Sequence, residues 1–306
     1  MPVLGELDWA FWEEHGYVVI PNAVPPANLE ALVERIWKFL EMDASDRESW
    51  YRYRPYTRAD HCSPISEAGM VEMYQHQTLW DNRQYPRVHQ AFSEILGTEK
   101  LWVSLDRANM KPPARRDKPE WGHKGMIHWD IDTSAIHPLE GDEMAATWRP
   151  NPSMHLSVQG VLYLTDTEAD QGGFQCIPGF HRTYHKWVKS QPAGRNPRFP
   201  DLSGLEIKAV DGKAGDLVIW HRLLAHGNGH NRSTRPRLAQ YITMSPAREE
   251  DESERSARIR SWQECRPMPN WQGDPRDWEH RHQTPARLTP LGRKLLGVDS
   301  WIEATT

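Results

Sequence analysis

The sequence predicts a mainly β fold with flanking helices, whose core is a double-stranded β-helix of the jelly-roll, cupin-like type. Two observations carry this prediction. From residue 101 onward, short apolar segments are separated by turns rich in glycine, proline and aspartate, without helical segments between them. Before residue 101, apolar residues recur with helical spacing instead. Helices followed by antiparallel strands fit this order, whereas a parallel α/β sheet needs a helix after each strand.

The first hundred residues are expected to be mostly helical. Residues 18–20 predict one short strand. After a proline pair, apolar residues recur at three- and four-residue intervals and predict a helix, its apolar face being Leu29, Leu32, Val33, Ile36 and Leu40. A second helix is expected over residues 88–96. Residues 43–86 show no clear period, and we interpret them as irregular chain that covers part of a pocket.

The jelly-roll core is expected over residues 101–246. The strand candidates within it are residues 101–110, 126–132, 154–164, 173–177, 205–210, 216–221 and 237–244. The segment 226–236 is rich in glycine, asparagine and serine and is interpreted as a turn. The C-terminal extension, residues 247–306, begins with a highly charged segment that is expected to be helical or exposed, and a final short helix is expected near residues 288–301. The whole chain, 1–306, is interpreted as one domain.

Composition restricts the class of protein. The formal net charge of -5 argues against a general attraction to nucleic acids, and no apolar run approaches the roughly 20 residues that cross a membrane. The basic residues Lys111, Arg115, Arg116 and Lys118 are interpreted as a solvated loop. The three cysteines form no CxxC pair, which argues against a zinc ribbon and fits a reducing compartment. We therefore expect a cytoplasmic enzyme with a small-molecule substrate; a homo-oligomer stays open.

A metal site is indicated by residues 125–132. His128 and Asp130 are two positions apart, so in a strand both side chains project to the same side while Trp129 points away. A histidine and an aspartate at this spacing are weak evidence alone, because the chain contains 15 histidines. Asp132 is the second choice for the carboxylate, since it would need an irregular strand.

The third ligand has to come from elsewhere in the chain. His226 follows a predicted strand and precedes two glycines that allow a sharp turn, but His221 and His230 compete with it, and spacing alone does not decide. Two histidines and one carboxylate leave three coordination positions open, as an oxygenase requires for its co-substrate and O2. A closed structural zinc site would need four protein ligands.

Arg237 favours His226 as the third ligand. It lies eleven residues after His226, at the start of the next predicted strand. A dicarboxylate that chelates iron at one end needs a cation for its far carboxylate, and a guanidinium can bind that group with two parallel hydrogen bonds. A single arginine is more often a surface ion pair, which is the interpretation for Arg232 and Arg235.

In this order the segments resemble the phytanoyl-CoA dioxygenase-like family of iron(II)/2-oxoglutarate oxygenases. The resemblance covers nearly the whole chain, and it is carried by residues 15–32, the His-x-Asp of 128–130, the glycine turn and Pro-Gly-x-His of 171–182, residues 215–241, and residues 288–297. Each segment is modest alone, but together and in this order they are specific.

The resemblance implies a set of site residues. Iron(II) would be held by His128, Asp130 and His226, and 2-oxoglutarate by Arg237. Asn228 stands where many members have a serine near the co-substrate. The weaker co-substrate candidates, each of which also fits a satisfied buried amide, are Asn109 and Gln159. Two further departures affect the substrate pocket: Val161 stands where many members have a tryptophan, and residues 133–153 resemble an insertion.

The activity implied is oxygenation with Fe(II), 2-oxoglutarate and O2, in which a small-molecule metabolite is hydroxylated and succinate and CO2 are released. Asp130 favours hydroxylation over halogenation, because halogenating relatives replace this carboxylate with a small residue. Desaturation, cyclisation and epoxidation use the same ligands and stay open.

Three alternatives stay open at this point. The first is a cupin-type metal oxygenase without 2-oxoglutarate, and the second is a catalytically silent barrel that binds a small molecule. The third is an interaction role for the C-terminal tryptophans Trp262, Trp271 and Trp278. For these tryptophans, packing against the barrel or a second subunit is the favoured interpretation.

Overall fold

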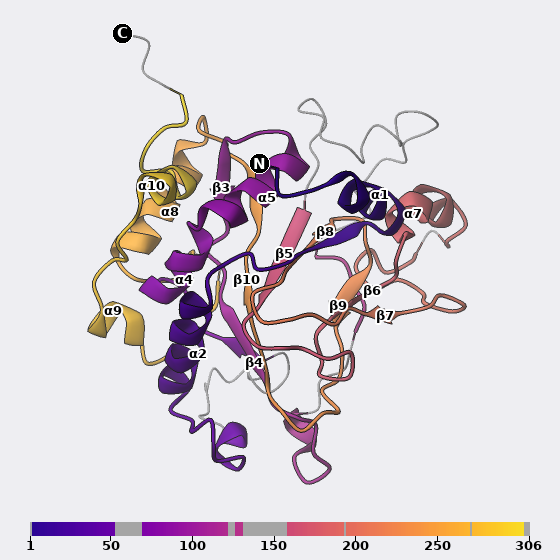
Figure 1. Ribbon diagram of the computed structural model, residues 1–306, viewed down its shortest axis with the longest axis horizontal. Coiled ribbons are helices and arrows are strands. Elements are labelled where there is room, and N and C mark those ends of the chain that lie inside the picture. Colours follow the sequence, from indigo (N-terminus) through magenta and orange to yellow (C-terminus); the bar gives the residue numbers. More distant parts are fainter. Residues whose placement is uncertain are drawn as a thin grey trace.

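The strands form three antiparallel sheets (Figure 1). The computed structural model describes residues 2–52, 69–121, 126–130, 158–192, 194–269 and 271–302. Within these ranges the strand orders are β1-β8-β5-β10-β4-β2, β7-β6-β9 and β11-β3. The strands are β1 (Tyr17–Ile20), β2 (Met70–Val71), β3 (Leu101–Val103), β4 (Ala108–Lys111), β5 (Val158–Tyr163), β6 (Phe174–Cys176), β7 (Lys208–Ala209), β8 (Leu217–His221), β9 (His226–Asn228), β10 (Arg237–Tyr241) and β11 (Met244–Pro246).

Most helices gather on one side of the six-stranded sheet, and α1 and α7 lie side by side near the three-stranded sheet (Figure 1). The α-helices are α1 (Glu6–His15), α2 (Pro26–Leu40), α4 (Gln77–Arg83), α5 (Pro86–Leu96), α7 (Phe180–Lys189), α8 (Glu252–Gln263), α9 (Trp278–His282) and α10 (Pro290–Leu296). Short 3₁₀ turns span Ser49–Tyr51 and Pro119–Trp121. Both α2 and α5 have a proline in the first helical turn. Proline lacks a backbone N–H, and because N–H groups in the first turn have no acceptor within the helix, no helical hydrogen bond is lost.

Both faces of the six-stranded sheet are buried, in two separate cores. In β5, Val158 and Leu162 belong to the larger core beneath the helices, whereas Val161 and Tyr163 belong to a smaller core that also contains Phe174 of β6. The alternation follows from the two-residue period of a strand. Because the smaller core joins the six-stranded sheet to the three-stranded one, the two sheets pack face to face, and the predicted jelly-roll core with flanking helices is confirmed.

The predicted strands are confirmed with three corrections. The candidate over residues 101–110 is two strands, β3 and β4, which lie in different sheets. The candidate over 126–132 is wrong in its described part, residues 126–130, which contain only a single β-bridge. The predicted turn 226–236 begins with a strand, β9, because its first three residues pair with β6. The expected insertion, residues 133–153, lies outside the described residues.

The predicted helices α2, α5, α8 and α10 are confirmed, but others were not expected. Helix α4 and strand β2 lie within residues 43–86, which were expected to be irregular. Helix α1 has a very weak amphipathic pattern, with Trp12 as its one buried residue, so periodicity does not reveal it. Helix α7 starts from Gly179, which adopts the left-handed conformation that the predicted turn requires.

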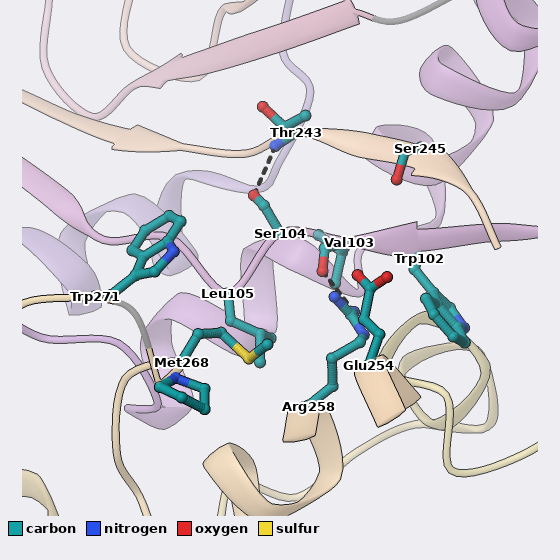
Figure 2. A pocket seen from close by; sticks show the side chains of 11 residues that line it. Trp102, Val103, Ser104, Leu105, Thr243, Ser245, Glu254, Arg258, Met268 and Trp271 are labelled. Carbon is teal, nitrogen blue, oxygen red and sulfur yellow. Dashed lines mark hydrogen bonds between the residues drawn. The ribbon is translucent and has the colours of Figure 1, made fainter. Parts of the chain in front are cut away.

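The C-terminal extension packs against the rest of the chain through a buried arginine. The guanidinium of Arg258 on α8 donates a hydrogen bond to the carbonyl group of Val103 (2.7 Å), which lies beside it in Figure 2. It also donates to the carbonyl groups of Leu295 (3.0 Å) and Leu296 (3.1 Å). The last two carbonyls belong to the C-terminal end of α10, where intrahelical partners are missing. One side chain therefore joins α8, α10 and β3.

A buried carboxylate makes a second connection. Glu279 of α9 is 4% exposed and accepts hydrogen bonds from the backbone N–H groups of Tyr74 (2.6 Å) and Gln75 (2.9 Å). Trp278 beside it packs edge-on against Phe39 of α2, with ring centroids 6.1 Å apart. The prediction that the C-terminal tryptophans pack against the body of the protein is thus confirmed for Trp278.

The described helices include none that is both long and apolar enough to span a membrane.

We predict that Arg258→Met lowers the free energy of unfolding by about 2–4 kcal/mol, because three buried carbonyl groups lose their charged donor. Urea unfolding followed by tryptophan fluorescence measures this change. Arg260→Met on the exposed side of the same helix is the control, and its effect should stay within about 0.5 kcal/mol. Equal effects of the two substitutions would contradict the connecting role of Arg258.

Candidate metal centre

Two backbone hydrogen bonds bring the predicted metal-binding residues together. The N–H of His128 donates to the carbonyl of His226 (2.8 Å), and the N–H of His226 donates back to the carbonyl of His128 (3.0 Å). Gly227 allows this close approach, because a Cβ atom there would lie 2.1 Å from the carbonyl oxygen of Met126. The loop before Asp130 is thereby held against β9.

Each histidine ring is oriented by a backbone carbonyl. Nδ1 of His226 lies 2.9 Å from the carbonyl oxygen of Leu224, and Nδ1 of His128 lies 3.3 Å from that of Met126. A carbonyl oxygen can only accept, so Nδ1 carries the proton in both rings. Nε2 of each ring then faces Asp130, at 3.2 Å from Oδ1 for His128 and 3.3 Å from Oδ2 for His226.

This donor set fits a divalent metal ion. One ligand atom from each of His128, Asp130 and His226 lies within 4.8 Å of the others. Burial acts to raise the pKa of Asp130, but hydrogen bonds donated by His128 and His226, when their rings are protonated on both nitrogens, and by Gln159 hold that pKa well below its usual range, so the carboxyl group is ionised. A ring protonated on Nδ1 alone carries a lone pair on Nε2 and donates no hydrogen bond to the carboxylate, so a bound cation would stabilise the two rings and the carboxylate in place of those protons.

The competing candidates do not join this cluster. His221 is 4% exposed, and its Nδ1 accepts a hydrogen bond from the N–H of Leu223 inside the fold. His230 lies on the exposed side of the turn after β9. Asp132 lies outside the described residues. Trp129 points away from the cluster as predicted, since it is fully buried and donates from Nε1 to the carbonyl of Leu223.

Gln159, a weaker co-substrate candidate, lies against the carboxylate of Asp130 and lines the pocket. Its Nε2 donates to Oδ2 of Asp130 at 2.6 Å, across from β5. Arg198 approaches the other oxygen, with Nη2 3.8 Å from Oδ1, while its Nε donates to the carbonyl of Trp129. Hydrogen bonds of this kind around a ligand fix its orientation. Gln159 is therefore suited to position the carboxylate.

Asn228 and Asn109 converge on one hydroxyl group. Nδ2 of Asn228 lies 2.9 Å from the hydroxyl oxygen of Tyr241, and Nδ2 of Asn109 lies 3.4 Å from it. Asn109 is fully buried, as the interpretation as a buried amide implied, whereas Asn228 is partly exposed in the pocket. Tyr241, which the sequence did not single out, thus connects β10 to β9 beside the metal cluster.

Arg237 and Lys111 form a pair of buried basic residues. They are register partners in β10 and β4 and are 0% and 3% exposed. Nε of Arg237 donates to the carbonyl of Gly172, and Nζ of Lys111 donates to the carbonyl of Gly229 (2.8 Å). Within the described part of the chain, Nη1 and Nη2 of Arg237 have no hydrogen-bond partner. The interpretation of Lys111 as part of a solvated loop is therefore wrong.

The pKa of Lys111 shows that a positive charge on its amine is unfavourable in this position. Burial, together with the charge of Arg237, lowers the pKa of Lys111 from its usual value to about 6, so the amine is largely neutral at pH 7. No acidic side chain among the described residues forms an ion pair with either group. A buried guanidinium without an anion is costly, and so is a charge on the amine beside it, so the site favours a ligand that brings a carboxylate to these two residues.

The metal cluster opens into a pocket of about 360 Å³ between the sheets. Its other lining residues are Met70, Asp106, Arg107, Gln159, Gly160, Val161, Phe174, Trp220, Gly227, Asn228, Tyr241, Thr243 and Trp271. Val161, which stands where the resemblance implies a tryptophan, lines this pocket. Asp106, Arg107 and Trp271 were not predicted from the sequence, because nothing in their local pattern marks residues that only the tertiary fold brings together.

Comparison with known proteins identifies a matching family. The model of the family described as phytanoyl-CoA dioxygenase matches residues 12–239. A protein of Dictyostelium discoideum named after phytanoyl-CoA dioxygenase is 25% identical over 266 residues, which cover 78% of this chain and 74% of the relative. An ectoine dioxygenase of Bordetella bronchiseptica is 30% identical over 176 residues, which cover 52% of this chain and 51% of that enzyme.

A solved structure supports the fold. The epimerase SnoN, in complex with Fe³⁺, α-ketoglutarate and nogalamycin RO, superposes with a TM-score of 0.50 at 16% sequence identity. The superposition covers 93% of this chain and 95% of that enzyme. At this identity the likeness concerns the fold.

We predict that Asp130→Ala and His226→Ala each weaken divalent metal binding by more than about 100-fold, because one of three ligands is lost. Changes outside the ligand set typically cost roughly 10–100-fold. Anaerobic titration with Co(II), followed by its visible absorption, measures the affinity. His230→Ala is the matched control, since this histidine is exposed on the same turn; a loss of affinity in that variant equal to the loss in His226→Ala would show that the cluster does not hold the metal.

Proposed function

The chain belongs to the phytanoyl-CoA dioxygenase family of iron(II)- and 2-oxoglutarate-dependent oxygenases, and from this premise we propose that it hydroxylates a small-molecule metabolite with release of succinate and CO2. The proposal assigns His128, Asp130 and His226 as the iron ligands. Their ring nitrogens and carboxylate oxygens converge within 4.8 Å, and three protein ligands leave positions for a co-substrate and O2.

The observation that carries the proposal is the pair of buried basic residues at one end of β4 and β10. Arg237 directs two nitrogens without partners among the described residues into the protein interior, and Lys111 lies beside it. The far carboxylate of 2-oxoglutarate would accept two parallel hydrogen bonds from the guanidinium. It would also favour the charged form of Lys111, which was expected from the sequence to lie in a solvated loop. Lys111 is therefore proposed as a second contact for this carboxylate.

The remaining residues of the pocket have supporting roles in this proposal. When bound, iron(II) with 2-oxoglutarate and O2 supplies the oxidant for an unactivated C–H bond. Gln159 holds Oδ2 of Asp130 at 2.6 Å and so keeps the carboxylate in one orientation. Phe174 and Trp220 pack against the ring of His226, at centroid distances of 6.1 Å and 4.9 Å, and exclude water from it. Asn228 and Tyr241 offer hydrogen-bond donors to the co-substrate.

The carboxylate of Asp130 favours hydroxylation over halogenation. A halide needs a coordination position that becomes free when this residue is small, and here Asp130 fills that position. Its ionised state, maintained by the two histidines, keeps it a strong ligand for a hard cation such as Fe(II).

We expect the anaerobically purified protein to form succinate slowly when it receives Fe(II), ascorbate, 2-oxoglutarate and air. The turnover should disappear in His226→Ala and persist in His230→Ala. Addition of the true substrate should then stimulate succinate release. If no succinate forms and calorimetry detects no 2-oxoglutarate binding, an oxygenase without this co-substrate, or a binding barrel, would replace the proposal.

Arg237→Ala should raise the apparent KM for 2-oxoglutarate about 10- to 100-fold, since charge-assisted hydrogen bonds typically contribute about 1.5–3 kcal/mol. The effect on kcat at saturating co-substrate should be smaller. Arg235→Ala is the matched control, because Arg235 lies two residues away and pairs at the surface with Glu168 (2.8 Å). An unchanged KM in Arg237→Ala would remove this residue from the co-substrate site.

A further inference from the structure

One end of the pocket carries charged side chains and lies away from Lys111 and Arg237, which are not among the residues that line the pocket. Lys111 and Arg237 mark one end of the β4–β10 pair. Asp106 and Arg107 precede β4 and line the metal pocket. Lys111 is five positions after Asp106, a distance of roughly 16 Å along an extended chain. The end near Asp106 is therefore separate from the proposed co-substrate contacts and is free to recognise a substrate.

The charge of Arg107 is already compensated at this end. Nη1 of Arg107 donates to Glu72 (3.2 Å) and to the hydroxyl of Tyr74 (2.5 Å), and Glu72 is 1% exposed. The guanidinium also lies near two aromatic rings, 5.6 Å from the centroid of Tyr74 and 5.4 Å from that of Trp271. Arg107 is thus held in place by an anion and two rings, and it positions Trp271 at the pocket.

The carboxylate of Asp106 has fewer hydrogen-bond and ion-pair partners than the guanidinium of Arg107. Its Oδ1 accepts the N–H of Arg107 (2.8 Å), and Nε of Arg107 lies 3.8 Å from the same oxygen. Among the described residues, no hydrogen bond reaches Oδ2, and the side chain is 26% exposed within the pocket lining. Burial raises the pKa of Asp106 to about 6, and the nearby charge of Asp130 acts in the same direction, while Arg107 and Arg83 oppose it.

Trp271 supplies an accessible aromatic surface beside this carboxylate. It is 37% exposed and comes from the C-terminal extension. Together with Thr243, Trp271 also lines a neighbouring cavity of about 280 Å³, in which Figure 2 shows the indole near Leu105 and Met268. The indole is therefore a wall between two cavities, and a flat face of such a ring attracts cations.

We propose that the substrate carries a protonated amine, which Asp106 binds through Oδ2 and which the indole of Trp271 contacts. This inference rests on the proposed function, since it takes the pocket beside the metal cluster as the substrate pocket. Glu72 pairs with Arg107, and the guanidinium of Arg83 donates to the backbone carbonyl groups of Tyr74 and Asp106. Oδ2 of Asp106 is therefore the carboxylate oxygen at this end that stays available to a ligand. An ammonium group would form a charge-assisted hydrogen bond there, whereas a carboxylate on the substrate would meet like charge.

The test compares fragments that differ only in their polar group. The probes are benzylamine, benzyl alcohol and benzoate, and cyclohexylmethylamine, cyclohexylmethanol and cyclohexanecarboxylate as a second set. The full-length protein is loaded with Zn(II), which does not turn over, and with 2-oxoglutarate. Dissociation constants are measured by saturation-transfer NMR at pH 7.5, where Asp106 is ionised. We expect each amine to bind about tenfold or more tightly than its alcohol, with the carboxylate weakest.

Two substitutions from separate segments locate the preference. Asp106→Asn should reduce the amine-to-alcohol ratio to less than about twofold, and Trp271→Leu should weaken amine binding by about two- to fivefold. Asp166→Asn is the control, because this carboxylate pairs at the surface with Lys213 (3.0 Å). Thermal unfolding of each variant verifies folding, and Asp106→Glu, which keeps the charge, should keep the preference if the asparagine variant does not fold.

Two outcomes would overturn the proposal. One is equal or undetectable binding of amine and alcohol by the unchanged protein, and the other is an amine preference that survives Asp106→Asn. Because the fragments are measured without turnover, this result is independent of succinate formation. Succinate formation without an amine preference would reject only the substrate class, and an Asp106-dependent amine preference without succinate formation would reject only the oxygenase activity.

Discussion

The paired backbone hydrogen bonds between His128 and His226 are the contact on which the geometry of the centre depends. They join a loop that has no other described strand pairing to β9, and β9 in turn pairs with β6. The ring nitrogens are then directed by carbonyl groups two residues earlier in each segment. Because backbone atoms set the spacing, the carboxylate of Asp130 meets both rings, and Gly227 is needed to let the two segments approach.

Local sequence patterns predicted those features that depend only on residues close together in the chain. The helical period of residues 29–40 predicted α2, and the spacing of His128 and Asp130 predicted that both face one side. The sequence left His221 and His230 open as alternatives to His226, and only the fold separates them, since one is inside a core and the other is exposed. That choice depends on how β8 and β9 are placed in different sheets, which no local spacing encodes.

The features that the sequence did not predict arise from long-range pairing. Lys111 looked like one of several basic residues in a loop, but pairing of β4 with β10 places it beside Arg237 in the interior. Nothing in the sequence distinguishes Tyr241 from other aromatic residues in strands, and its role depends on β9, which places Asn228 within hydrogen-bond distance of its hydroxyl. Helix α1 has almost no apolar period; it lies against α7, and its buried Trp12 packs near the ring of His221 in β8. That the chain is one domain stays a prediction.

The pocket is assembled from segments that are far apart in the chain. The basic residues of β4 and β10, the proposed metal ligands and Asp106 all precede residue 240, whereas Trp271 at the rim lies between α8 and α9 in the chain and packs against Tyr74. During synthesis on the ribosome, the residues proposed for the chemical step are therefore made before this aromatic wall of the substrate end. The wall can be completed only after the segment between α8 and α9 has been made.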